Sequence, residues 1–103
     1  MRSGRLEKRI QRAIPVEISA LQHPPLIERA STENVSPLGV RLLTKQPMER
    51  DARLIIRSLV GDQKTVARVV YCQRLADGRF GVGMQFLGAS VNWSKEWIGT
   101  ANR

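Results

Sequence analysis

The sequence has little of the chemistry on which catalysis and metal binding depend. Its 103 residues include one cysteine, Cys72, and one histidine, His23. One cysteine cannot form an internal disulfide, and the two residues together cannot supply the ligands of a structural zinc site. His23 precedes two prolines and Cys72 lies in a run typical of a strand, so neither is placed for nucleophilic catalysis. We therefore predict a protein that is not an enzyme, with no catalytic residue, no metal and no cofactor.

Long apolar runs and aromatic residues are also scarce. No run approaches the length of a membrane-spanning helix, and no hydrophobic segment of a signal peptide follows Met1. The opening segment from Met1 to Arg5 is polar and basic, so we expect a cytoplasmic protein without a membrane span. Aromatic residues make up 5% of the chain, and two of them, Trp93 and Trp97, lie near its end. A barrel that binds nucleic acid by base stacking needs several aromatic side chains on its strands, so nucleic acid is not an expected partner.

Acidic residues are outnumbered by bases. The 17 lysines and arginines against 9 aspartates and glutamates give a formal charge of +8. Such an excess is typical of proteins that bind nucleic acid, an anionic membrane or a phosphorylated small molecule, although it can also serve solubility alone. The segment near the N-terminus contains one acidic residue, Glu7. Its basic residues are Arg2, Arg5, Lys8, Arg9 and Arg12. A cluster at one end of the chain favours local capture of a phosphate group over binding along a duplex.

The pattern of apolar residues predicts an all-β domain. The chain is long enough for one domain with a modest core and too short for two. Period-two alternation or β-branched residues mark six segments as strands, separated by turn signals such as Asp77-Gly78. These segments are 14–20, 26–32, 39–44, 52–59, 65–73 and 79–87. Six short strands favour a small closed antiparallel barrel, and Gly81 and Gly83 in the last strand indicate sharp coiling or a close backbone approach.

The two ends of the chain differ from this pattern. Residues 1–12 carry the basic cluster without a sustained period. We expect a flexible arm that is ordered when an anionic ligand bridges it to the domain, because ordering costs about 1–2 kcal/mol per residue. Residues 13–103 are expected to form the barrel domain, with a short helix from about residue 90. Trp93 and Trp97 share one face of this helix, which we expect to cover an open end of the barrel.

Two motifs, in order along the chain, give the strongest functional signal. The stretch from Asn34 to Gly39 has the pattern Asn-x-Ser-x-x-Gly, and the basic run Lys8-Arg9-Ile10-Gln11-Arg12 precedes it and leads into the first strand. An Arg-x-x-x-Arg pair followed by Asp/Asn-x-Ser-x-x-Gly resembles the PilZ domain family. The strand pattern after Gly39 extends this resemblance over nearly the whole chain. Lys8 stands where the family has its leading arginine.

The resemblance implies a protein that binds cyclic di-GMP, a ligand with two phosphates and two guanines. By position, Lys8, Arg9 and Arg12 would contact the phosphates and the guanine edges, as basic side chains can. Asn34 and Ser36 would meet the other guanine from the barrel side, and Gly39 would leave room for it. Arg5, Arg41 and Arg74 are further candidates for ligand contacts. Tyr71 lies where many members have an aromatic residue and is interpreted as a packing residue of the barrel.

The register of the first motif has an alternative. Arg5-Leu6-Glu7-Lys8-Arg9 matches Arg-x-x-x-Arg literally. We favour Lys8 and Arg12, because in the family the second arginine directly precedes a first strand that often opens with proline and valine, as Pro15-Val16 does here. A lysine at the first position neutralises a phosphate but cannot form the planar guanidinium fork, so the replacement is expected to lower affinity.

The function also has alternatives. The main hypothesis is a bacterial receptor of second-messenger signalling in motility or biofilm formation, in which the ordered arm alters a surface for an unidentified downstream protein. The second is a PilZ-like adaptor of pilus or flagellar systems that binds no nucleotide and acts through protein contacts. The third is a basic barrel that binds nucleic acid.

Overall fold

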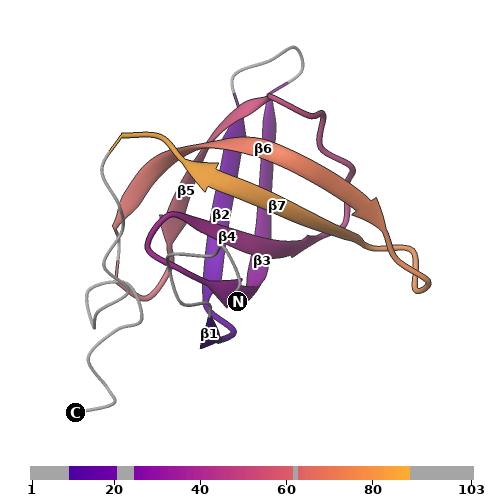
Figure 1. The fold of residues 1–103 in the computed structure, drawn as a ribbon, viewed down its shortest axis with the longest axis horizontal. Helices are drawn as coiled ribbons and strands as arrows, with labels where there is room; N and C mark the ends of the chain where they lie inside the picture. Colours follow the sequence, from indigo (N-terminus) through magenta and orange to yellow (C-terminus); the bar gives the residue numbers. More distant parts are fainter. Residues whose placement is uncertain (1–9, 21–24, 62, 89–103) are drawn as a thin grey trace, which may run out of the picture.

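The computed structural model describes residues 10–20, 25–61 and 63–88, which form one antiparallel sheet of seven strands (Figure 1). The strands are β1 (Ile10–Gln11), β2 (Pro15–Ala20), β3 (Leu26–Val35), β4 (Gly39–Thr44), β5 (Arg53–Ser58), β6 (Lys64–Arg74) and β7 (Phe80–Phe86). The six segments expected from the sequence correspond to β2 to β7. The alternation of apolar and polar residues was therefore sufficient to find every strand of the barrel.

The sheet closes on itself. Its strand order is β1-β3-β2-β5-β6-β7-β4, and β4 pairs back with β3. The predicted Asp77-Gly78 turn joins β6 and β7 into a long hairpin, with Gly78 at a φ of 90° (Figure 1). Strands β2 to β7 thus form the closed six-stranded antiparallel barrel that the sequence predicts. Strand β1 is an addition that pairs with the end of β3.

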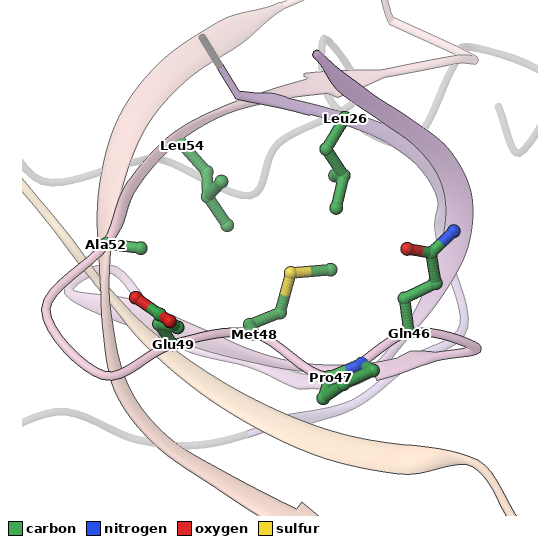
Figure 2. A pocket seen from close by; sticks show the side chains of 7 residues that line it. All are labelled: Leu26, Gln46, Pro47, Met48, Glu49, Ala52 and Leu54. Carbon is green, nitrogen blue, oxygen red and sulfur yellow. The ribbon is translucent and has the colours of Figure 1, made fainter. Parts of the chain in front are cut away.

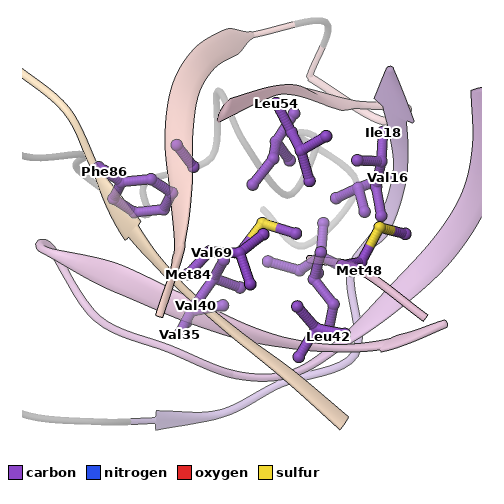
Figure 3. Close-up of a cluster of buried hydrophobic side chains, with 14 residues drawn as sticks. Val16, Ile18, Val35, Val40, Leu42, Met48, Leu54, Val69, Met84 and Phe86 are labelled. Carbon is purple, nitrogen blue, oxygen red and sulfur yellow. The ribbon is translucent and has the colours of Figure 1, made fainter. Parts of the chain in front are cut away.

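One face of each barrel strand fills the interior, where the apolar side chains gather in one cluster (Figure 3). The members with no exposed surface are Val16, Ile18, Val35, Leu42, Ile56, Ala67, Val69 and Val82. Burial of an aliphatic side chain of this size contributes about 1.5–3 kcal/mol relative to leaving it exposed. The interior therefore fixes which face of each strand points outward, and every candidate ligand contact must come from those outer faces or from the connections.

Strand β3 is longer than expected. It continues past Thr32 to Val35, so Asn34 of the second motif lies in a strand and not in a loop. The sequence of this end is polar, and the register with β4 shifts between Thr32 and Asn34, which interrupts the alternation. Thr32 points inward with 2% of its surface exposed. Its hydroxyl accepts a hydrogen bond from the Ile14 amide at 2.8 Å and donates one to the Arg12 carbonyl at 2.5 Å.

The end of the N-terminal arm also differs from expectation. Residues 1–12 were expected to be flexible, but Ile10 and Gln11 pair with Val35 and Asn34 of β3. The Arg12 amide continues this pairing with a bond to the Glu33 carbonyl at 3.3 Å. The unpredicted extension of β3 provides the partner groups, so the arm is attached to the barrel from Ile10 onward. The rest of the arm, residues 1–9, and the helix expected from about residue 90 lie outside the described residues.

Within 10–20, 25–61 and 63–88, no helix is long and apolar enough to cross a membrane. The same residues contain no group of three or more His, Cys, Asp or Glu side chains that could hold a metal ion.

Candidate ligand-binding site

The turn between β3 and β4 is held together by the serine of the second motif. The Ser36 amide donates to the Gly39 carbonyl at 2.9 Å, and the Gly39 amide donates to the Ser36 hydroxyl at 3.1 Å. Ser36 has 1% of its surface exposed. Its hydroxyl therefore shapes the turn, and the expected contact of Ser36 with a guanine stays a prediction.

Gly39 is required by close packing of two strands. A Cβ atom at this position would lie 2.6 Å from the Met84 carbonyl oxygen of β7. The neighbouring Leu38 carbonyl accepts a hydrogen bond from the Phe86 amide at 2.9 Å, which holds the turn against β7. The sequence indicated that Gly39 allows a close approach, and the structure places a backbone there. Gly39 also lines the hollow beside Tyr71, and its expected role in leaving room for a guanine stays a prediction.

The outer faces of five strands bring candidate residues into one row. Gln11 of β1 lies opposite Asn34 of β3, and Asn34 lies opposite Arg41 of β4. Arg41 lies opposite Gly83 of β7, and Gly83 lies opposite Tyr71 of β6. Residues directly opposite in an antiparallel sheet project from the same face about 4.5–5.5 Å apart. The row thus joins the second motif to Arg41, which the sequence named only as a further candidate.

Arg41 is the centre of a polar cluster that we call the Arg41 cluster, made of Glu33, Arg41, Tyr71 and Gln73. The Arg41 guanidinium donates from Nε to Glu33 Oε1 at 2.5 Å and from Nη1 to the Tyr71 hydroxyl at 2.9 Å. Nη1 also donates to Gln73 Oε1 at 3.2 Å. The Arg41 Cζ atom lies 5.8 Å from the centroid of the Tyr71 ring, within the range of a cation–π contact.

These contacts hold the guanidinium in a fixed position. The hydrogen bond to Glu33 and, next, the hydrogen bond to Tyr71 raise the pKa of Arg41 above its ordinary value. The Arg41 side chain keeps 20% of its surface exposed. A cation that is oriented before a ligand arrives loses less conformational freedom on binding than a mobile one.

Two glycines of β7 form the floor of the Arg41 cluster. A Cβ on Gly81 would collide with the Arg41 guanidinium, and a Cβ on Gly83 would collide with the Tyr71 ring. This explains the glycines that the sequence showed in the last strand, because two large side chains lie flat across them. Beside Tyr71 the surface is hollowed by about 300 Å³, lined by Leu38, Gly39, Val70, Tyr71, Gly83, Met84 and Gln85.

Tyr71 has a different role from the one expected. It was interpreted as a packing residue of the barrel, but it lies on the outer face with 41% of its surface exposed. The register of β6 with β7 shifts between Val69 and Tyr71, so Val70 and Tyr71 both point outward. Glu33 and Gln73 were missed as well. The sequence signal that could have found them is the glycine pair, since two glycines on one outer face leave room for side chains from the strands on either side.

The other predicted residues are distributed as follows. Arg12 is exposed and lies next to Gln11 at the end of the row, with its backbone bonded to Glu33. Arg74 lies opposite Phe80 at the end of β6, one residue beyond Gln73 of the Arg41 cluster. The candidates Arg5, Lys8 and Arg9 lie outside the described residues.

A second hollow, of about 470 Å³, lies between the start of β3, the connection from β4 and the start of β5 (Figure 2). It is lined by Leu26, Gln46, Pro47, Met48, Glu49, Ala52 and Leu54. None of the residues that the two motifs indicate is among these. The Arg41 cluster, in contrast, combines a fixed cation with an exposed aromatic side chain and lies in one row with Asn34 of the second motif.

Comparison with known proteins agrees with this assignment of the fold. None of the curated proteins matches the chain. A solved structure of MrkH from K. pneumonia, in complex with c-di-GMP, has a similar fold with a TM-score of 0.65 and 14% sequence identity. The match covers 84% of this chain and 45% of the MrkH chain, so the protein spans less than half the length of that structure. The family model described as the PilZ domain matches residues 3–96, and the chain therefore belongs to the PilZ domain family.

Proposed function

We propose that this protein is a receptor for cyclic di-GMP. The observation that carries the proposal is the Arg41 cluster, a fixed guanidinium beside an exposed tyrosine, in one row with Asn34 of the second motif. Arginine can grip phosphate oxygens or the O6 and N7 acceptors of guanine, and an aromatic ring offers a face for base stacking. The family match and the fold shared with MrkH, which was solved with c-di-GMP, support this ligand.

The basic run supplies the remaining positive charge. Ile10 is paired with Val35, so the base of the arm lies beside Asn34 without a ligand. An extended chain covers about 3.3–3.6 Å per residue, so Arg9 and Lys8 lie within about 7 Å of backbone from Ile10. In the proposed complex Lys8, Arg9 and Arg12 contact phosphates and guanine edges, and Asn34 and Arg41 contact the ligand from the barrel. Ser36 and Gly39 act by holding the turn.

The proposed mechanism is ligand-induced ordering of the arm. The ligand contacts both the barrel and the bases before Ile10, and it stabilises the arm position in which those contacts exist together. The new arm position then alters a surface that a downstream protein reads. The chemistry is binding without catalysis.

An isothermal calorimetry series tests the proposal. Cyclic di-GMP is titrated into the wild type and into Arg12→Ala, and GTP and a short single-stranded DNA are titrated separately as controls. We expect saturable heat with cyclic di-GMP alone and a loss of at least about tenfold in affinity in the variant. Arg50→Ala is the matched control, because it removes one exposed positive charge from the connection before β5.

The other outcomes distinguish the alternatives. Binding that survives Arg12→Ala and is lost in Arg9→Ala would place the first motif at Arg5 and Arg9. Absence of heat, together with an unchanged melting temperature at high ligand concentration, would overturn the receptor and favour the adaptor that acts by protein contacts. Binding of the single-stranded DNA instead would favour the nucleic-acid hypothesis.

A further inference from the structure

The wall of the barrel formed by β2 and β5 carries an exposed apolar row. Ile27 of β3 lies opposite Ser19 of β2, Ser19 lies opposite Ile55 of β5, and Ile55 lies opposite Val66 of β6. The three apolar members expose 68%, 39% and 43% of their surface in that order. We call Ile27, Ser19, Ile55 and Val66 the apolar row. Neighbouring strands lie about 4.8 Å apart, so the row spans about 14 Å.

The apolar row lies on the opposite side of the barrel from the Arg41 cluster. In the closed order β3-β2-β5-β6-β7-β4, the pair β2 and β5 is separated from the pair β4 and β7 by one strand on each side. The motifs and the proposed ligand therefore make no use of this wall. Three exposed aliphatic side chains lie in this row of four strands, with Ser19 between two of them. Exposed apolar residues scattered singly are normal on protein surfaces, whereas apolar residues gathered in one patch mark an interaction site.

Basic residues border the apolar row on both sides. One neighbouring row contains Arg29, Glu17, Arg57 and Lys64, which lie opposite one another in that order. On the other side Arg53 lies opposite Arg68. Glu17 is paired with Arg57 at 3.1 Å and Asp51 with Arg68 at 2.8 Å, so the acids are already neutralised. Within the described residues Arg29, Arg53 and Lys64 have no recorded ion pair.

The centre of the apolar row is hollowed. Ser19 is small and stands between two isoleucines, and a depression of about 400 Å³ opens there, lined by Ser19, Ala20, Arg53, Leu54, Ile55 and Val66. A depression of this kind receives a projecting side chain, as the anchor residues of protein interfaces do. Its lining is apolar apart from Ser19 and Arg53, so an apolar side chain with an acidic neighbour fits it.

We propose that the apolar row is a docking surface for an acidic protein segment that carries apolar side chains. The apolar side chains cover Ile27, Ile55 and Val66, one of them enters the depression at Ser19, and carboxylates meet Arg29, Arg53 and Lys64. Charge complementarity selects this occupant. A second copy of the chain would bring basic borders against basic borders, and a flat membrane surface would leave the depression unfilled. This proposal is independent of cyclic di-GMP binding.

The test uses a fluorescently labelled amphipathic peptide of leucine and glutamate. A peptide of leucine and lysine with the same sequence pattern is the control of opposite charge. Anisotropy measures affinity for the full chain, and amide chemical shifts of ¹⁵N-labelled protein locate the site. We expect saturable binding of the acidic peptide only, with shifts centred on Ser19, Ile27, Ile55 and Val66. Ile27→Lys and Arg53→Glu should each weaken binding about tenfold or more.

Matched controls separate the apolar row from general charge. Val60→Lys changes an exposed apolar residue that is outside the row, and Arg50→Glu reverses a charge that does not border it. Both should bind the peptide as the wild type does. Melting temperatures confirm that each variant folds, and a cyclic di-GMP titration of Ile27→Lys should match that of the wild type if the proposed ligand binds at all.

Four results would overturn the proposal. Peptide shifts confined to the Arg41 cluster or the arm would show binding by charge alone. Self-association of the wild type that Ile27→Lys abolishes would identify a second copy as the occupant. Sedimentation with vesicles of phosphatidylglycerol, lost in the same variant, would identify a membrane. A Trp93→Gln/Trp97→Gln variant that shifts the amides of the apolar row in the free protein would identify the chain's own C-terminal segment.

Discussion

The two opposite walls of the barrel are built from the same kind of strands but present different surfaces. On the β4–β7 wall the outward residues include Gly81 and Gly83, and Arg41 and Tyr71 lie flat across them. On the β2–β5 wall the outward residues are Ser19, Ile55 and their neighbours, which stand up from the sheet. Where a strand has glycine on its outer face, long side chains from the neighbouring strands can lie flat over it and form hydrogen bonds with one another, which fixes the cluster.

The outward residues of each wall decide what that wall can bind. The Arg41 cluster holds a cation in place and suits an anionic ligand of defined shape. The apolar row has exposed aliphatic groups with basic residues at its borders, and it suits a protein partner that covers the exposed apolar surface. Both walls share one interior, so a change on one wall should leave the other intact when the interior is not disturbed.

The largest expected effect comes from adding a side chain where the β4–β7 wall is closely packed. Gly39→Val places atoms against the Met84 carbonyl, so the backbone must shift, and we expect a loss of about 2–4 kcal/mol in the free energy of unfolding. Ser19→Val, on the other wall, should change it by less than about 0.5 kcal/mol. Urea denaturation of both variants measures the difference. Equal losses would show that the two walls tolerate added volume alike.

The next effect concerns the base of the arm. Thr32→Val keeps the shape of the side chain but removes the hydroxyl, so the buried Ile14 amide loses its acceptor and the Arg12 carbonyl loses its donor. We expect a loss of about 1–3 kcal/mol in unfolding free energy, and faster hydrogen exchange at Ile14. Thr65→Val, at a half-buried position of β6, is the control. An unchanged exchange rate at Ile14 would contradict the role given to Thr32.

A third prediction separates ligand affinity from stability. Gly83→Ala pushes on the Tyr71 ring, which is exposed and can swing away, so the unfolding free energy should fall by about 1 kcal/mol or less. The displaced ring also releases Arg41, and affinity for cyclic di-GMP should fall about tenfold. Val66→Ala on the other wall should leave affinity unchanged. Calorimetry compares the two, and wild-type affinity in Gly83→Ala would remove Tyr71 from the proposed site.

The smallest effects come from two surface ion pairs, one on each wall. Glu33→Gln weakens the pair with Arg41, and Glu17→Gln weakens the pair with Arg57. Both pairs are solvent-exposed in part, so each change should cost less than about 1 kcal/mol of stability. Only Glu33→Gln should alter cyclic di-GMP affinity, since only Glu33 orients a proposed ligand contact. An equal change in affinity for both variants would point to net charge as the cause.

The alternation of residues predicted the barrel well and the candidate site less well. Six strand segments and the Asp77-Gly78 turn are confirmed because burial of one face imposes period two. Two register shifts explain why the sequence pattern misplaced residues of the candidate site. One, near Glu33, moved Asn34 into a strand, and the other placed Tyr71 outside, where simple alternation from Val69 would put it inside. A bulge depends on pairing with a distant strand, so a local pattern does not reveal it.

By itself the sequence determined that residues 14–87 form an all-β barrel, and it showed the basic N-terminal run and the Asn-x-Ser-x-x-Gly motif, because period, turn chemistry and charge are local properties. Only the tertiary structure decided that Ser36 and Gly39 hold a turn, that Arg41 is fixed by Glu33 and Tyr71, and that Ile27, Ile55 and Val66 align in one row. These facts depend on strand register around a closed sheet. Strand register is set by packing of the whole interior, so it cannot be read from any short segment of the sequence.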